Sequence, residues 1–163
     1  FMGDGIMSSR AVVQNAGNAY RLTAERFMEE FALGRSMHQL SLRFTQALMA
    51  QMVQTGACNR HHTIAQQLCR WLLLTLDRLP GDKVTMTTQL IANMLGVDRE
   101  GVINATNHLQ NNGSIYYSAG NITVLNRKRL ESASCECYAA VRNEIERLFA
   151  YEAPPTPKST PAR

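Results

Sequence analysis

The stretch TTQLIANMLGVDREGVINATNHL, residues 87–109, decides the fold of this 163-residue chain. Thr87 is a favourable N-cap for a short first helix, and Asp98 is a strong N-cap for a second one. Gly96 follows the last turn of the first helix, where the backbone becomes left-handed and glycine adopts that conformation without steric cost. The residues expected to face inward are Ile91, Met94 and Leu95 on the first helix, and Val102, Ala105, Thr106 and Leu109 on the second. This pattern predicts a helix-turn-helix.

The polar residues of the second helix lie outside this inward stripe and cluster toward its first half. In a helix-turn-helix that half enters the major groove of DNA. Arginine pairs with guanine through two hydrogen bonds, glutamate accepts from cytosine, and asparagine pairs with adenine. We therefore expect Arg99, Glu100 and Asn104 to read bases and Asn107 to contact phosphate. His108, near the end of this helix, is expected to be a solvated side chain, with a phosphate contact as the alternative.

Two β-rich runs follow directly, SIYY at 114–117 and ITVL at 122–125, around the polar turn SAGN at 118–121. Such a pattern predicts a hairpin, which after a helix-turn-helix is a wing. Ser118 and Asn121 are placed near its tip, where they can donate to phosphates. Some winged helices bind proteins instead of DNA, so a protein-interaction module stays open as an alternative.

Composition sets weaker limits on function. The net charge of +4 and pI of about 9.1 fit a nucleic-acid partner, but residues 84–131 have a balance of only +1. No acid/base pair, nucleophile triad or phosphate-binding glycine loop is recognisable, so we expect no enzyme. The cysteine spacing does not match a disulfide framework, no signal peptide is evident, and no apolar run is long enough to span a bilayer. A cytoplasmic protein with reduced thiols is expected.

The first third of the sequence predicts two short strands, a short helix and one long helix. Residues 10–22 are interpreted as two short strands around a turn at 15–18, and Thr23 as the cap of a helix over 24–32. Residues 36–58 predict a helix longer than roughly 30 Å, which outruns the core of so small a domain. It carries an apolar seam suited to a partner helix, although it could instead lie on its own domain's core. The seam is Met37, Leu40, Phe44, Ala47 and Leu48.

Two further helices complete the expected fold, which is mainly α with a small β component. Residues 63–79 are apolar almost all round, which predicts a buried helix that ends at Pro80. Residues 127–149 predict a last helix, and the proline-rich tail, 151–163, is expected to be disordered. The expected organisation is a dimerisation helix over 34–60 and a winged helix-turn-helix domain with a C-terminal helix over 61–150.

The run LGVDREGVIN, residues 95–104, resembles the recognition segment of Crp/Fnr-type regulators, the cyclic AMP receptor protein family. The order of elements over residues 10–131 is also similar. The resemblance is strengthened by ACNRH at 57–61, RWLL at 70–73 and CECY at 135–138, which are typical of one branch.

This resemblance implies a dimer helix, a hinge at residues 58–62 and DNA reading by Arg99 and Glu100. Asn104 stands where the family's best-known member has a second arginine, which changes the expected base preference. Thr88, Gln89 and Ser118 match positions that contact phosphate. The implied partners are double-stranded DNA, a second copy of the chain and RNA polymerase, in a bacterial cytoplasm.

The chain departs from the family at its N-terminus, where a full β-roll would bind an effector. Residues 1–33 match only a remnant of that domain, with its last strands and a short helix. Residues 8–11 faintly resemble the family's phosphate-binding cassette, but we expect no cyclic-nucleotide site and no cofactor in this chain. The effector is unknown, and a redox or ligand sensor in which DNA binding is secondary remains the other alternative.

The cysteines and histidines do not have the spacing of a recognisable metal site. Cys58, His61 and His62 offer ligands, but no fourth ligand has a recognisable spacing. Cys135 and Cys137, two residues apart on an expected helix, should point to different faces. The sequence therefore predicts a polar hinge and ordinary packing thiols, with no metal and no redox role.

Overall fold

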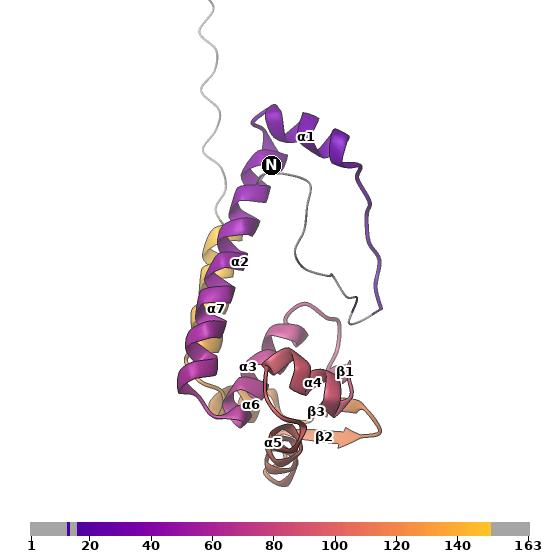
Figure 1. Cartoon of the computed structure of the whole chain (residues 1–163), viewed down its shortest axis with the longest axis vertical. Helices are drawn as coiled ribbons and strands as arrows, with labels where there is room; N and C mark the ends of the chain where they lie inside the picture. Colours follow the sequence, from indigo (N-terminus) through magenta and orange to yellow (C-terminus); the bar gives the residue numbers. More distant parts are fainter. Residues whose placement is uncertain (1–12, 14–15, 151–163) are drawn as a thin grey trace, which may run out of the picture.

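The computed structural model describes residues 13 and 16–150, in which two long elements rise from a small winged domain (Figure 1). Helix α2 (Ser36–His61) and helix α7 (Cys137–Phe149) pack side by side, and α1 (Ala24–Ala32) lies against the far end of α2. The remaining elements form the domain: α3 (Ile64–Leu76), β1 (Lys83–Thr85), α4 (Thr88–Leu95), α5 (Arg99–Asn111), β2 (Ile115–Ser118), β3 (Asn121–Val124) and α6 (Arg127–Ala133). This confirms the predicted fold class, a mainly helical chain with a long helix and a winged helix-turn-helix.

Helix α3 is the centre of the domain's core. It begins with a capping box, in which Thr63 Oγ1 accepts from the Gln66 backbone and Gln66 Oε1 accepts from the Thr63 backbone. Helices α5, α6 and α7 and strand β1 all contact α3, so its apolar surface is covered on several sides. Its fully buried side chains include Leu68, Leu72 and Leu73.

A three-stranded antiparallel sheet of order β1-β3-β2 closes one side of the core. Ile122 of β3 pairs with Val84 of β1 and with Tyr117 of β2, and both Val84 and Ile122 are buried. The β2–β3 hairpin is the predicted wing. Strand β1 was absent from the sequence-based prediction, because three residues carry too little periodicity to identify a strand.

The predicted last helix over 127–149 is wrong, because the structure has two helices there. The α-helix α6 ends at Ala133, and Ser134 adopts an extended backbone with φ −79° and ψ 164°. Its hydroxyl donates to the Glu131 carbonyl at 2.9 Å, a local bond with which serine competes against helix continuation. Helix α7 then begins at Cys137 in a new direction.

The expected strands over 10–22 are not found in the part of that range that is described, residue 13 and residues 16–22, which has no regular structure. The rest of that range, the cassette-like residues 8–11 and the tail 151–163 lie outside the described residues. The helix predicted over 24–32 is confirmed, with Thr23 as its N-cap. Within the described residues, no helix has the length and apolar character needed to cross a membrane.

The long helix extends further than predicted, to His61 rather than about residue 58. The segment expected to be a polar hinge is therefore helical, and the chain changes direction only at His62 and Thr63, which adopt extended backbone. Gln67 Nε2 donates to the His62 carbonyl at 2.9 Å and fixes this corner.

Candidate nucleic-acid interface

The helix-turn-helix forms through the capping residues that the sequence predicts. Thr87 Oγ1 accepts from the Leu90 backbone at 3.3 Å and starts α4, and Gly96 ends it with a left-handed φ of +69°. Asp98 Oδ1 accepts from the Gly101 backbone at 2.6 Å and starts α5. Both helices are thus fixed at the corner between them, which sets their crossing.

Helix α5 separates a buried face from an exposed one as predicted. Val102, Ala105, Thr106 and Leu109 are buried against the domain. The exposed face lies at the end of the molecule opposite α1, and so it is free to meet a partner (Figure 1). The exposed residues are Arg99, Glu100, Ile103, Asn104, Asn107 and His108.

The structure brings predicted base-reading and phosphate-contacting residues together at the start of both helices. Arg99 Nε donates to Thr88 Oγ1 at 3.3 Å, which joins the first residue of α5 to the first residue of α4. On α4, Gln89 Nε2 donates to Asn93 Oδ1 at 3.0 Å. Polar donors from two helix N-termini therefore share one surface, where the helix dipoles also favour an anion.

The wing places its two predicted residues opposite each other, since Ser118 and Asn121 form the last pair of the β2–β3 register. Both are exposed. Thr85 Oγ1 donates to Asn121 Oδ1 at 2.9 Å, so β1 helps to orient the wing tip. Sequence reasoning missed Thr85, since its role depends on pairing with a strand 36 residues further along the chain.

Hydrogen bonds connect the wing to the recognition helix α5. Gln110 Oε1 accepts from the Tyr117 backbone at 2.9 Å, and the Ser114 carbonyl accepts from the Leu125 backbone at 2.9 Å. Arg129 of α6 donates to the Asn112 carbonyl just beyond α5. These bonds hold α5 and the hairpin together as one unit.

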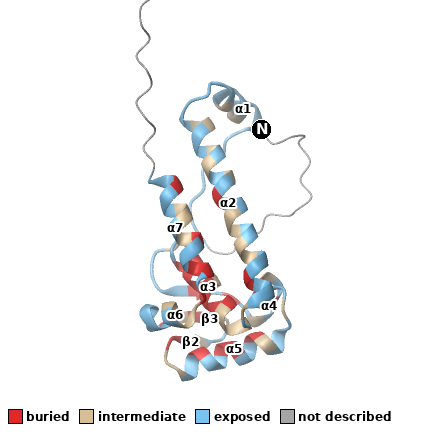
Figure 2. Cartoon of the chain, turned by 90° about the vertical axis from the view of Figure 1, so that its left-hand side faces the viewer, coloured by how far each residue is buried: buried red, intermediate tan, exposed pale blue. Residues whose placement is uncertain are grey.

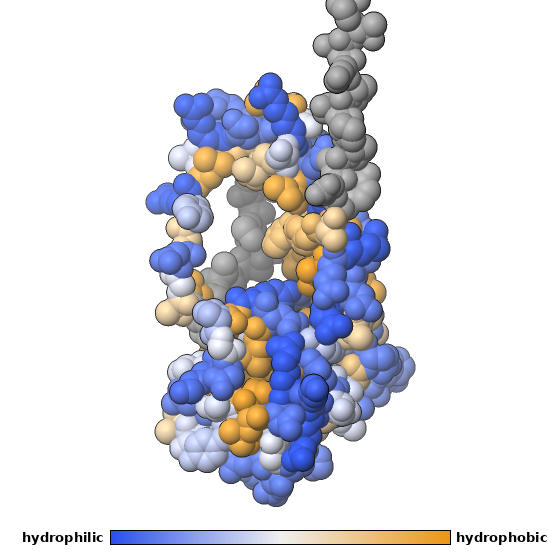
Figure 3. All heavy atoms as spheres, turned by 180° about the vertical axis from the view of Figure 1, so that it is seen from behind, coloured by the Kyte–Doolittle hydropathy of each residue, from blue (hydrophilic) through white to orange (hydrophobic). Residues whose placement is uncertain are grey.

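The predicted seam of α2 is largely exposed in a single chain. Phe44 is 61% exposed, Leu40 48% and Leu48 45%, while Met37 is partly buried. Ala47 differs, because it is only 6% exposed and is packed within the protomer. Figure 3 shows the back of the molecule, where several hydrophobic residues lie at the surface of its upper half.

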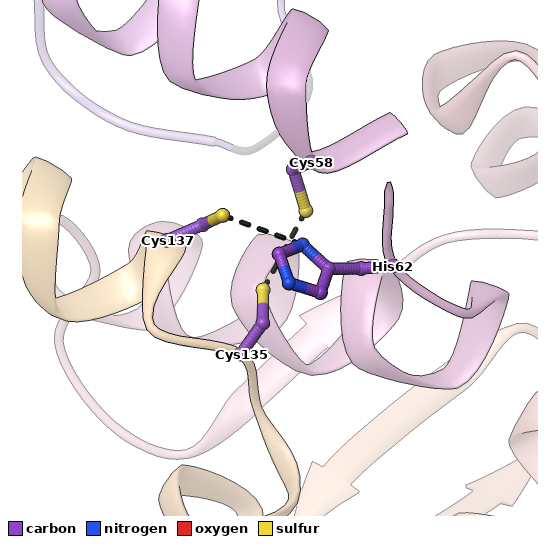
Figure 4. A group of neighbouring side chains, drawn as sticks. All are labelled: Cys58, His62, Cys135 and Cys137. Carbon is purple, nitrogen blue, oxygen red and sulfur yellow. Dashed lines mark hydrogen bonds between the residues drawn. The ribbon is translucent and has the colours of Figure 1, made fainter. Parts of the chain in front are cut away.

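A second group of side chains, Cys58, His62, Cys135 and Cys137, meets where α2 ends and α7 begins (Figure 4). Their ligand atoms all lie within 4.8 Å of one another. The sequence-based argument against a shared metal is wrong here, since the break at Ser134 takes Cys135 out of any helix and turns its side chain toward Cys137. A helix end carrying Cys58 and His62 four residues apart, together with a CxC pair, was the available signal.

Burial shapes the chemistry of these thiols in the absence of a metal. Burial raises the pKa of Cys58, and it raises the pKa of Cys135 to about 12. Cys58 and Cys135 are therefore protonated as free thiols at neutral pH, and they become good nucleophiles or ligands only where something replaces the proton.

Comparison with known proteins gives the following likenesses. Residues 66–133 match the family model of the Crp-like helix-turn-helix domain. No curated protein matches the chain. A protein assigned to the Crp/Fnr family of transcriptional regulators from Eubacterium rectale has a similar structure, with 21% identity, a TM-score of 0.51 and 68% of this chain covered. FixK2 from Bradyrhizobium japonicum is similar with 18% identity, a TM-score of 0.51 and 68% of this chain covered. The matches cover 51% and 58% of those two structures, so this chain spans little more than half of their length.

Proposed function

This chain carries the Crp-like helix-turn-helix domain over residues 66–133, and from that premise we propose that it is a sequence-specific DNA-binding transcription regulator. Domains of this kind are binding modules and not enzymes. The likeness to the two solved regulators supports the fold alone, so the proposal depends on the residues that the domain presents.

The observation that carries the proposal is the exposed first half of α5. Arg99, Glu100 and Asn104 are exposed there, and each has a base edge that it can pair with in the major groove. A carboxylate at this position is repelled by the phosphates, so Glu100 fits base reading better than general adhesion to DNA. We propose these three residues as base readers.

The surrounding polar residues are proposed as phosphate contacts that position the domain. Thr88 and Gln89 start α4, Asn107 lies further along α5, and Ser118 and Asn121 lie at the wing tip. Contacts of this type fix register on the duplex but carry no sequence information directly.

We propose further that two copies pair through α2, within the segment 34–60, and bind a palindromic operator with their domains over 61–150. The exposed seam of Leu40, Phe44 and Leu48 supports this, since a helix with such a seam needs a partner in water. Two recognition helices related by a dyad would read half-sites roughly 34 Å apart. RNA polymerase is the proposed partner through which the bound dimer acts, in the cytoplasm, and we assign no surface to it.

The experiment is a DNA-binding titration with variants at both kinds of position. Arg99→Ala should weaken binding to the preferred site by about 1–3 kcal/mol per half-site and relax the preference at one base pair. Ser118→Ala, the matched control, should weaken binding to all sequences alike. Affinity should fall with added salt, as phosphate contacts require. A chain with no salt-dependent affinity for DNA would instead be a protein-interaction module.

A further inference from the structure

Four side chains that the proposed DNA-binding function does not use converge on one point, with their ligand atoms all within 4.8 Å of one another (Figure 4). Cys58 Sγ lies 3.5 Å from Cys135 Sγ, and Cys137 Sγ lies 3.5 Å from His62 Nδ1. A tetrahedron with zinc–sulfur bonds of about 2.3 Å has edges of about 3.8 Å, close to these separations. The printed separations are therefore close to those that four ligands of one small cation require.

The site is dry and separate from the main core. Cys58, Cys135 and Cys137 are all nearly inaccessible to solvent and form their own small buried cluster, while the His62 side chain is mostly buried. The adjacent main core is filled mainly by leucines and other apolar side chains. Three cysteines and a histidine would fill such a space less well than apolar side chains do. Their grouping calls for an explanation beyond packing.

Polar groups outside the cluster orient two of the four ligands, His62 and Cys137. His62 Nε2 lies 3.2 Å from Glu136 Oε1, which leaves Nδ1 directed at the thiols. This carboxylate–histidine arrangement is the one that metal-bound histidines commonly have. Gln54 Nε2 donates to Cys137 Sγ at 3.0 Å, as an amide does to a thiolate ligand.

We propose that Cys58, His62, Cys135 and Cys137 bind one Zn²⁺ ion in a closed, structural site. Soft thiolate ligands in a tetrahedral set favour zinc over hard cations such as Mg²⁺ or Ca²⁺. Four protein ligands complete the coordination and leave no open position for water, so the ion has a structural and not a catalytic role. The three thiols release their protons on binding and become thiolate ligands, so the complex with neutral His62 carries one net negative charge. The guanidinium of buried Arg70 acts electrostatically on Cys58 and offsets that charge.

The ion would tie together two regions of the chain that are distant in sequence. Cys58 lies in the last turn of α2 and His62 directly follows that helix, while Cys135 lies in the break after α6 and Cys137 in the first turn of α7. Zinc binding would thus fix the direction in which the long helix leaves the winged domain. It would also give a reason for the break in the C-terminal helix, which is needed to bring Cys135 into the set.

The test starts with the unaltered full chain, purified without a histidine tag under reducing conditions. We expect one zinc per chain by elemental analysis. After exchange into Co²⁺, we expect thiolate-to-cobalt charge-transfer bands and the strong visible bands of a tetrahedral centre. The variant Cys135→Ser should lose the zinc, whereas Cys69→Ala should keep it, because Cys69 is equally buried but lies in the main core.

One variant avoids the risk that a ligand change simply unfolds the protein. Glu136 is largely exposed, so Glu136→Gln should leave the fold intact and weaken Co²⁺ affinity by about 10–100-fold. The proposal would be overturned by a reduced chain that holds no zinc and gives no cobalt bands. It would equally be overturned if the Cys135→Ser variant retained the ion.

Discussion

Helices α2 and α3 are consecutive, yet α3 is largely buried within one chain and α2 is largely exposed (Figure 2). Of the 13 residues in α3, eight are buried within a single chain. Of the 26 residues in α2, only Ala47 and Cys58 are buried. Burial of apolar surface is the main stabilising term in folding, so α3 serves the stability of one domain. Helix α2 packs one side against α7, and it can bury its exposed seam only against a partner.

This difference in burial means that α3 should determine the stability of a single chain, whereas the exposed seam of α2 should determine the association of two chains. Changes in α3 should affect unfolding at any protein concentration. Changes in the exposed seam of α2 should affect association, and with it any property that depends on two domains held at a fixed spacing.

The largest effect is expected for Leu72→Ala in α3. Leu72 is fully buried, and removing its side chain leaves a cavity that the surrounding core cannot close. We expect a loss of about 2–5 kcal/mol in the free energy of unfolding, measured by urea denaturation. A loss below about 1 kcal/mol would show that α3 is not the centre of the core.

Phe44→Asp should act on association and not on the winged domain. The carboxylate would be buried in the seam of both copies, and we expect dimerisation to weaken by about 3 kcal/mol or more. Sedimentation equilibrium should show a monomer at concentrations where the unaltered chain is a dimer. Gln39→Asp, on the opposite and exposed side of α2, is the control and should leave the dimer intact. If the unaltered chain were already a monomer at micromolar concentration, the proposal that α2 mediates dimerisation would be wrong.

Asp98→Ala tests whether α5 is stabilised from within its own chain. The lost N-cap bond to the Gly101 backbone should cost about 1 kcal/mol of unfolding free energy. Thermal unfolding in the Phe44→Asp background should give the same difference, because the cap lies inside the domain. A cost that disappears in the monomeric background would tie the cap to the dimer.

The smallest effect is expected at the tip of the wing. Ala119 has a left-handed φ of +47°, which is costly for a residue with a Cβ, and Ala119→Gly should stabilise the chain by about 0.5 kcal/mol. Gly120→Ala is the counterpart, since Gly120 has φ +79° and the added Cβ would be strained. Melting temperatures that move in the reverse directions would indicate a different turn.

The sequence predicted best the features whose signals are local. Thr87, Gly96 and Asp98 act within a few residues of themselves, so both helices of the helix-turn-helix and their corner were predictable. The break at Ser134 was not, because a continuous apolar pattern hid one serine that bonds back to its own helix. The cysteine–histidine cluster was missed for the same reason, since its geometry depends on that break and on the packing of α2 against α7. Spacing assigned Ala47 to the exposed seam, but Ala47 is buried within the protomer. Which side of α2 is buried depends on how the rest of the chain packs against it, which spacing alone does not show.

The most direct test of the central claim is selection of binding sites from a pool of random double-stranded DNA with the unaltered chain. We predict enrichment of a palindrome whose half-sites are centred roughly one helical turn apart, with a base preference that Arg99→Ala relaxes at symmetric positions. Enrichment of a single asymmetric half-site, or of no sequence at all, would contradict the proposal that paired α2 helices present two α5 helices to DNA.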